Sequence, residues 1–142
     1  MFFICNALKI VYNGPNLLAD IVLSAQTKGN KMAFYESVLV FRGDLTESQV
    51  KEKAAKFTEI IKELKGIIKS SEFWGLRNLA YIIRKNKRAH YVLLNVDMPG
   101  SAINEYERRL RIDEDVIRFL NVRVEKLLEG PSAMMKKSEE NE

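Results

Sequence analysis

The side chains most able to do chemistry in this chain are cations near its middle. Between Glu72 and Asp97 the sequence contains no acidic residue, and two runs rich in Ile, Val, Leu and Tyr flank a short basic connection at 86–89. This pattern predicts a long β-hairpin whose charged side chains stand in solvent or on a partner. The cations of the span are Arg77, Arg84, Lys85, Lys87 and Arg88. Such a concentration of positive charge favours a polyanionic partner.

A structural explanation of these cations stays open at this point. Charged side chains on an exposed strand also prevent edge-to-edge aggregation, and solvent alone then accounts for them. Arg118 and Arg123, in a later apolar run, would extend a basic strip and support the polyanion interpretation. The cluster from Arg108 to Arg111 ends a predicted helix, where cations also suit the helix dipole.

Residue patterns that indicate catalysis or metal binding are absent from the sequence. His90 is the single histidine and Cys5 the single cysteine, and neither has a sequence partner for nucleophilic or metal chemistry. There is no phosphate-binding loop and no dinucleotide glycine fingerprint. The acidic triplet 113–115 is read as a solvated turn. We therefore expect a protein without enzymatic activity, cofactor or metal site. One cysteine excludes an internal disulfide and favours a cytoplasmic setting.

Five large side chains of the same region are candidates for contact with a protein partner. Because alternate residues of a strand point to opposite faces, Tyr91 and Leu93 lie opposite the predicted core residues Val92 and Leu94. The candidate partner residues are Trp74, Leu76, Tyr81, Tyr91 and Leu93. Base stacking, or simple closure of the core by Trp74 or Tyr81, is the alternative.

The elements that must position these residues follow from periodicity and capping. Thr46 with Gln49 three residues on forms a capping box, and an apolar stripe from Val50 to Leu64 predicts the helix that follows. Pro99-Gly100 separates the hairpin from a second helix. The expected strands are 34–41, 67–85 (bent near Gly75), 90–98 and 116–127, and the expected helices are 46–64 and 101–111.

This order of elements is strand, helix, strand, strand, helix, strand. It predicts an α+β, ferredoxin-like split βαβ fold (βαββαβ), with a four-stranded antiparallel sheet. Right-handed crossovers place both helices on one face of that sheet and leave the other face open.

The chain of 142 residues carries a formal net charge of +4 and is long enough for one domain. Residues 1–31 differ in composition, and we interpret them as an N-terminal extension that is disordered or lies upstream of the natural start at Met32. Residues 32–130 form the predicted domain. Residues 131–142 form a polar tail that we expect to be disordered.

Four short segments resemble the bacterial small-subunit ribosomal protein S6 family. The most specific is Gly-Leu-Arg-Asn-Leu-Ala-Tyr, and the resemblance covers about 32–128 in the right order. The segments are Met32-Ala-Phe-Tyr-Glu36, Trp74-Gly-Leu-Arg-Asn-Leu-Ala-Tyr81, Val96-Asp-Met-Pro99 and Leu110-Arg-Ile112. Asn78 stands where the family commonly has a second basic residue, so no phosphate contact is carried over to it. Ile82 replaces a proline common in the family.

The resemblance implies a ribosome-associated structural protein without catalytic activity or cofactor. It further implies pairing with ribosomal protein S18 and binding to the central domain of 16S ribosomal RNA. A free-standing single-strand RNA binder of the RRM type shares this topology, but the third strand lacks an intact aromatic RNP signature. An acylphosphatase-type enzyme also shares it, but no glycine-rich anion loop follows the first strand. Fold alone does not separate the three.

Overall fold

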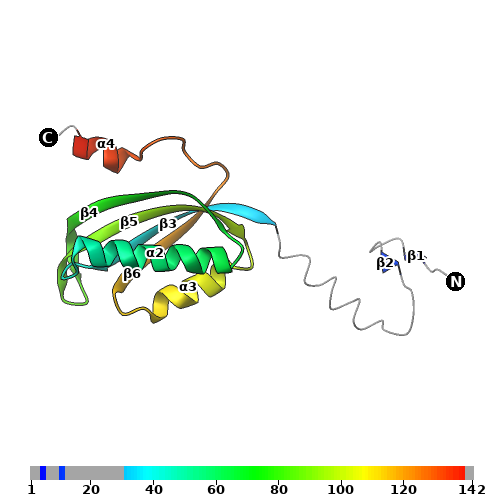
Figure 1. Cartoon of the computed structure of the whole chain (residues 1–142), viewed down its shortest axis with the longest axis horizontal. Coiled ribbons are helices and arrows are strands. Elements are labelled where there is room, and N and C mark those ends of the chain that lie inside the picture. Colours follow the sequence, from blue (N-terminus) through cyan, green and yellow to red (C-terminus); the bar gives the residue numbers. More distant parts are fainter. Residues whose placement is uncertain (1–3, 6–9, 12–30, 140–142) are drawn as a thin grey trace. The chain divides into compact units, whose positions relative to one another are not determined.

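A computed structural model describes residues 4–5, 10–11 and 31–139 of the chain, which divides into two units, Met1–Asn30 and Lys31–Glu142 (Figure 1). In the first unit, strands β1 (Ile4–Cys5) and β2 (Ile10–Val11) pair antiparallel. The rest of the predicted N-terminal extension lies outside the described residues, except for Lys31 at its end, whose carbonyl accepts a hydrogen bond from the Gly100 backbone at 3.3 Å.

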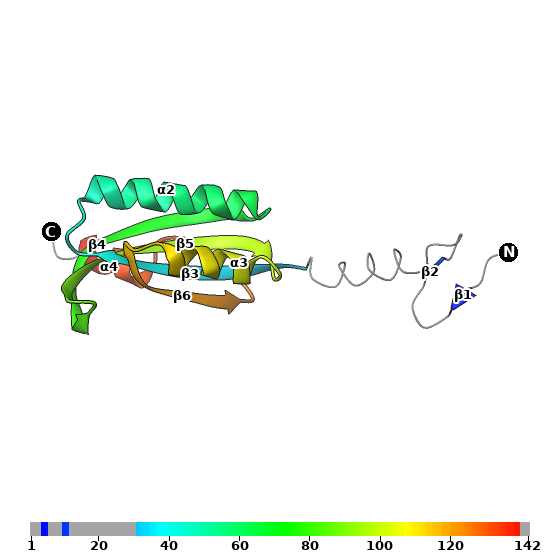
Figure 2. The same cartoon turned by 90° about the horizontal axis from the view of Figure 1, so that it is seen from below.

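The second unit has the predicted order of elements. Its sheet runs β4-β5-β3-β6 with every neighbouring pair antiparallel, and α2 and α3 lie on the same side of it (Figures 1 and 2). The predicted ferredoxin-like α+β fold is therefore confirmed. The elements are β3 (Met32–Arg42), α2 (Glu47–Glu63), β4 (Ile67–Ile83), β5 (Asn86–Pro99), α3 (Ile103–Ile112) and β6 (Val116–Val124).

Helix α2 begins with the predicted capping box. The Thr46 side chain accepts a hydrogen bond from the Gln49 backbone at 3.4 Å, and the Gln49 side chain accepts one from the Thr46 backbone at 2.9 Å. These bonds satisfy two backbone donors that the first turn would leave free. The apolar stripe then buries Val50, Ala54, Phe57 and Ile61, which fixes the helix on the sheet.

The main core lies between the sheet and the two helices. Val92, Leu94, Val96 and Met98 alternate along β5, and each is at most 1% exposed. They pack in one cluster with side chains of α2, α3 and β3. Because strand residues alternate between faces, the other parity of β5 looks toward the face that α2 and α3 leave uncovered. We call this second face the open face.

The hairpin turn lies nearer the N-terminus than expected. The chain reverses at Arg84 and Lys85, both with left-handed backbone (φ 45° and 64°), and β5 already begins at Asn86. The prediction placed the connection at 86–89, because neither turn residue is Asn or Gly, the usual signal for this conformation. The predicted irregularity at Gly75 is confirmed by a register shift and a φ of 75°.

The polar tail also differs from expectation. Residues Ala133–Glu139 form a short helix, α4, where the sequence predicted a disordered segment, and residues 140–142 of the predicted tail lie outside the described residues. β6 ends at Val124 and not near residue 127. Since α4 has only seven residues, its position depends on contacts with the sheet and not on local helix propensity.

The buried hydroxyl of Tyr106 should make the fold less stable at alkaline pH. It lies 3.1 Å from Ser37 Oγ inside the core, and burial raises the pKa of Tyr106 to about 12, against a smaller opposing effect of Ser37. The unfolded chain therefore ionises first, and the stability present below pH ~10 is lost as pH rises toward ~12. We expect a loss of roughly 2 to 3 kcal/mol across this window.

Tyr106→Phe should remove this loss while keeping the ring in place. Urea unfolding of both proteins at several pH values between about 9 and 11.5 measures this loss of stability, because the range includes the pKa of an unfolded tyrosine, ~10. Parallel stability curves for the two proteins would contradict the assignment to Tyr106.

Candidate functional site

The predicted cations gather at the hairpin end of the sheet. Arg84 and Lys85 form the turn itself, while Lys87 and Arg88 are at the start of β5, and all four side chains are exposed. Figures 1 and 2 show this turn beyond one end of the sheet. The structure thus presents four cations within five residues on a projecting tip.

Charge pairing separates these cations from those of α3. Arg108, Arg109 and Arg111 pair with Glu105, Glu63 and Glu107 at 2.7, 2.7 and 2.9 Å respectively. By contrast, within residues 31–136 none of the seven predicted RNA contacts has a carboxylate ion-pair partner. These seven are Arg77, Arg84, Lys85, Lys87, Arg88, Arg118 and Arg123. The positive charge of α3 is neutralised in place, and that of the hairpin is available to an anion.

Neutral groups hold three of the seven cations. Arg84 Nη1 donates to the Val116 carbonyl at 3.5 Å, and Arg77 Nε donates to the Trp74 carbonyl at 3.2 Å. Arg118 lies over the ring of Tyr81, 5.6 Å from its centroid, and donates to the Tyr81 hydroxyl. These contacts orient the guanidinium groups without cancelling their charge.

Arg118 and Arg123 lie on opposite faces of β6. Arg118 pairs in register with Val40, which belongs to the open face, whereas Arg123 pairs with Tyr35 of the main core. The structure therefore brings Arg118 toward the hairpin and leaves Arg123 apart from it, so that the predicted basic strip is divided between the two faces.

A second apolar cluster on the open face was missed in the sequence. Val40, Ala89 and Ile117 are its buried members. The available signal was the uninterrupted apolar run 38–41 in β3, because a strand with one solvent face alternates and this one does not. The partly buried members are Val38, Leu79, Ile83 and Tyr91.

An apolar groove of about 260 Å³ crosses this cluster. Leu79 and Tyr81 of β4 form one wall, and Arg118 and Leu120 of β6 form the other. Tyr81 is 57% exposed and Leu120 59% exposed. The groove therefore places accessible apolar surface directly beside the Arg118 guanidinium, which has no carboxylate partner within residues 31–136.

The five predicted partner residues do not form one patch. Trp74 and Tyr91 stack on the open face with ring centroids 6.4 Å apart, and Tyr81 lines the nearby groove. Leu76 is 40% exposed but pairs in register with His90, on the helix side of the sheet. Leu93 is only 7% exposed and so offers almost no surface in this structure, against the expectation of an accessible side chain.

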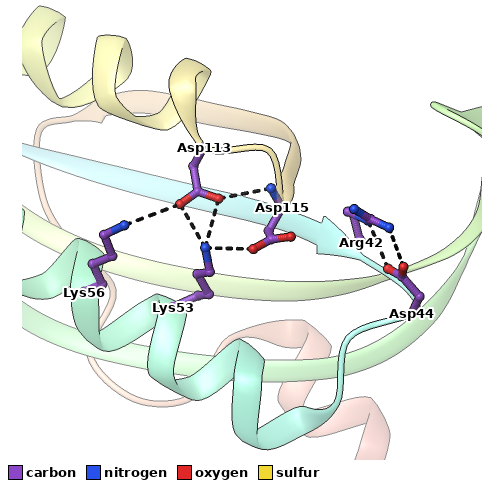
Figure 3. A network of polar contacts seen from close by, with 6 residues as sticks. All are labelled: Arg42, Asp44, Lys53, Lys56, Asp113 and Asp115. Carbon is purple, nitrogen blue, oxygen red and sulfur yellow. Dashed lines mark hydrogen bonds and ion pairs between the residues drawn. The ribbon is translucent and has the colours of Figure 1, made fainter.

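A polar network fixes the start of β6 (Figure 3). Lys53 of α2 bonds Asp113 at 3.2 Å and Asp115 at 2.7 Å, and the Asp115 carbonyl accepts from the Arg42 backbone at 3.0 Å. The bond to Asp115, followed by the bond to Asp113, raises the pKa of Lys53. Two members of the acidic triplet, Asp113 and Asp115, therefore form a salt-bridged anchor for β6 and its Arg118, while Glu114 is exposed as a solvated turn predicts.

His90, the remaining candidate for chemistry, has a structural role. His90 is 5% exposed, with Nε2 2.9 Å from the Leu45 carbonyl. The described part of the chain contains no group of His, Cys, Asp and Glu side chains that could hold a metal ion. Within that part, every helix is too short or too polar to cross a bilayer.

Comparison with known proteins gives consistent matches. The family "Ribosomal protein S6" matches residues 34–123. The small ribosomal subunit protein bS6 of Bradyrhizobium diazoefficiens is 53% identical over 108 residues, which are 76% of this chain and 65% of that protein, just under two thirds of its length. The bS6 protein of Azorhizobium caulinodans is 48% identical over 106 residues, which are 75% of this chain and 71% of that protein.

A solved structure matches the same region. The crystal structure of 30S ribosomal protein S6 from Thermotoga maritima has a TM-score of 0.63 and 25% identity. The match covers 78% of this chain and 97% of the Thermotoga chain. Sequence and fold thus lead to the same family as the quoted segments of the hairpin. The chain belongs to the ribosomal protein S6 family.

Proposed function

We propose that the protein is a structural constituent of the bacterial small ribosomal subunit that binds the central domain of 16S ribosomal RNA. The observation that carries this proposal is that, within residues 31–136, the hairpin and β6 cations have no carboxylate partner, whereas the three arginines of α3 are all paired. Phosphate contacts by such cations fix the position of a protein on RNA and do not read its sequence.

The hairpin tip is the principal phosphate contact in this proposal. Arg84, Lys85, Lys87 and Arg88 are exposed and lie within five residues around a tight turn, so they can reach neighbouring phosphates. Arg77 and Arg118 flank them on the sheet. Arg123, on the other face of β6, would touch a separate RNA segment.

The open face is the proposed site of the protein partner, ribosomal protein S18. The stacked pair Trp74–Tyr91 and the groove beside Tyr81 provide the aromatic and apolar surface that such interfaces use. Leu93 would join this interface only after becoming accessible, and Leu76 would contribute from the helix-side face of β4.

Family membership favours this function over the two alternatives on the same fold. The matched relatives are named as ribosomal proteins, and the sequence matches extend over most of the domain. We therefore propose a cytoplasmic, ribosome-associated role without catalytic activity or cofactor, and not a free RRM-type RNA binder or an acylphosphatase-type enzyme.

Sucrose-gradient sedimentation tests the proposal in the cell. An epitope-tagged copy of the chain should co-sediment with small subunits, and washing in ~1 M salt should weaken its retention because phosphate contacts are screened. Detection only in the soluble fraction at the top of the gradient would contradict the proposal.

A further inference from the structure

We propose that residues 130–139, hereafter the C-terminal cover, form a displaceable cover on the open face that competes with the protein partner for this surface. The inference rests on the proposed function, because competition requires a partner on the open face. Figure 1 shows α4 on the side of the sheet opposite α2 and α3, and Figure 2 agrees.

A hydrogen bond locates the C-terminal cover on the sheet. The Ser132 backbone donates to Glu72 Oε1 of β4 at 2.9 Å. Glu72 stands directly opposite Leu93 in the β4–β5 register. Leu93 is 7% exposed on a face that neither α2 nor α3 covers, which is the burial that a cover on this face would produce.

The same carboxylate connects the C-terminal cover to the aromatic pair. Glu72 Oε2 accepts from Trp74 Nε1 at 2.9 Å, and Trp74 stacks on Tyr91. Burial acts to raise the pKa of Glu72, but hydrogen bonds from Ser132 and Trp74 outweigh it and keep that pKa below its usual value. Glu72 thus holds the cover beside the very residues assigned to the partner.

The sheet is incompletely packed where the C-terminal cover begins. An open cavity of about 590 Å³ lies between Phe34, Ser70 and Glu72 on the sheet and residues 126–130, the segment that leads into the cover at Gly130. Ser132 Oγ and Asn95 Oδ1 are buried, and neither has a hydrogen-bond partner in the described structure.

Buried polar atoms without partners destabilise the arrangement that buries them, and cavities lose dispersion contacts. The α2 interface differs, since Phe57 and Ile61 there are at most 1% exposed. The contrast indicates that the helices are permanent parts of the core, whereas the C-terminal cover is held weakly enough for a partner to displace it.

Removing the C-terminal cover should therefore expose Trp74 and strengthen partner binding. The test compares the full chain with a chain ending after Gly130, and with a matched control that ends after Glu139 and keeps α4. Trp74 is the only tryptophan, so acrylamide quenching of its fluorescence reports its accessibility directly. Binding of purified ribosomal protein S18 reports competition.

We expect higher quenching and about tenfold tighter S18 binding for the chain ending after Gly130, since loss of one charge-assisted contact changes affinity on that scale. The control should match the full chain in both. Glu72→Gln, which keeps the full length, should shift both readouts in the same direction by less, and it tests the proposal if the shortened chain does not fold.

Each contrary outcome has a distinct meaning. Unchanged quenching in the shortened chain and in Glu72→Gln would overturn the placement of the C-terminal cover on the open face. Higher quenching with equal or weaker S18 binding would overturn the competition. Absence of S18 binding by every chain would overturn the partner assignment itself, while the quenching result would still decide whether the cover lies there.

Discussion

Replacing Arg84, Lys85, Lys87 and Arg88 together with alanine should weaken binding to a 16S central-domain RNA fragment by about a hundred- to a thousand-fold near physiological salt. The four side chains are exposed and make no ion pair within residues 31–136, so each is free to displace a counterion from a phosphate. The slope of log affinity against log salt should become shallower by about 3, at roughly 0.7 to 0.9 per lost contact. Titration at several salt concentrations measures both quantities.

The matched control removes the same charge from the other side of the molecule. Lys51, Lys62, Arg108 and Arg111 are exposed on α2 and α3, and their replacement by alanine should change the salt slope little. Equal thermal unfolding midpoints would show that both variants are folded. If the control lost as much affinity as the hairpin variant, net charge and not the hairpin would account for RNA binding.

Phe57→Ala should lower the free energy of unfolding by about 3 to 5 kcal/mol. The Phe57 side chain is 1% exposed at the centre of the α2 stripe, and its ring lies 6.3 Å from that of Phe41 in β3. Truncation removes the transfer free energy of the ring and leaves a cavity between helix and sheet. Urea denaturation of the variant and of the native chain measures the difference.

Glu59→Ala is the matched control for this prediction. Glu59 is exposed on the same helix, so its loss should change stability by less than about 0.5 kcal/mol. A loss below about 1 kcal/mol for Phe57→Ala would contradict the placement of α2 over the core, because even a single buried methylene contributes on that scale.

The fold was predictable because its signals are local. The Thr46–Gln49 capping box and the stripe of α2 lie within one helix, and the parity of β5 separates Val92 and Leu94 from Tyr91. The hairpin turn was misplaced because Arg84 and Lys85 adopt a left-handed backbone that their residue types do not signal.

The candidate site was predictable only in its charges. Which cations stay free depends on contacts across the fold, such as Arg109 with Glu63 and Arg118 with Tyr81, 46 and 37 residues apart. The position of the C-terminal cover depends on the same kind of contact, since Ser132 meets Glu72 60 residues away. Such pairings follow from tertiary packing, and no pattern within a short window specifies them.

Ultraviolet cross-linking of intact small subunits, followed by mass spectrometry of the nucleotide-bearing peptides, tests the central claim most directly. The claim is that the hairpin tip and Arg118, on the open face of β6, contact ribosomal RNA. We predict RNA cross-links within residues 84–88 and at Arg118. Cross-links confined to α2 and α3, with none on the hairpin, would contradict it.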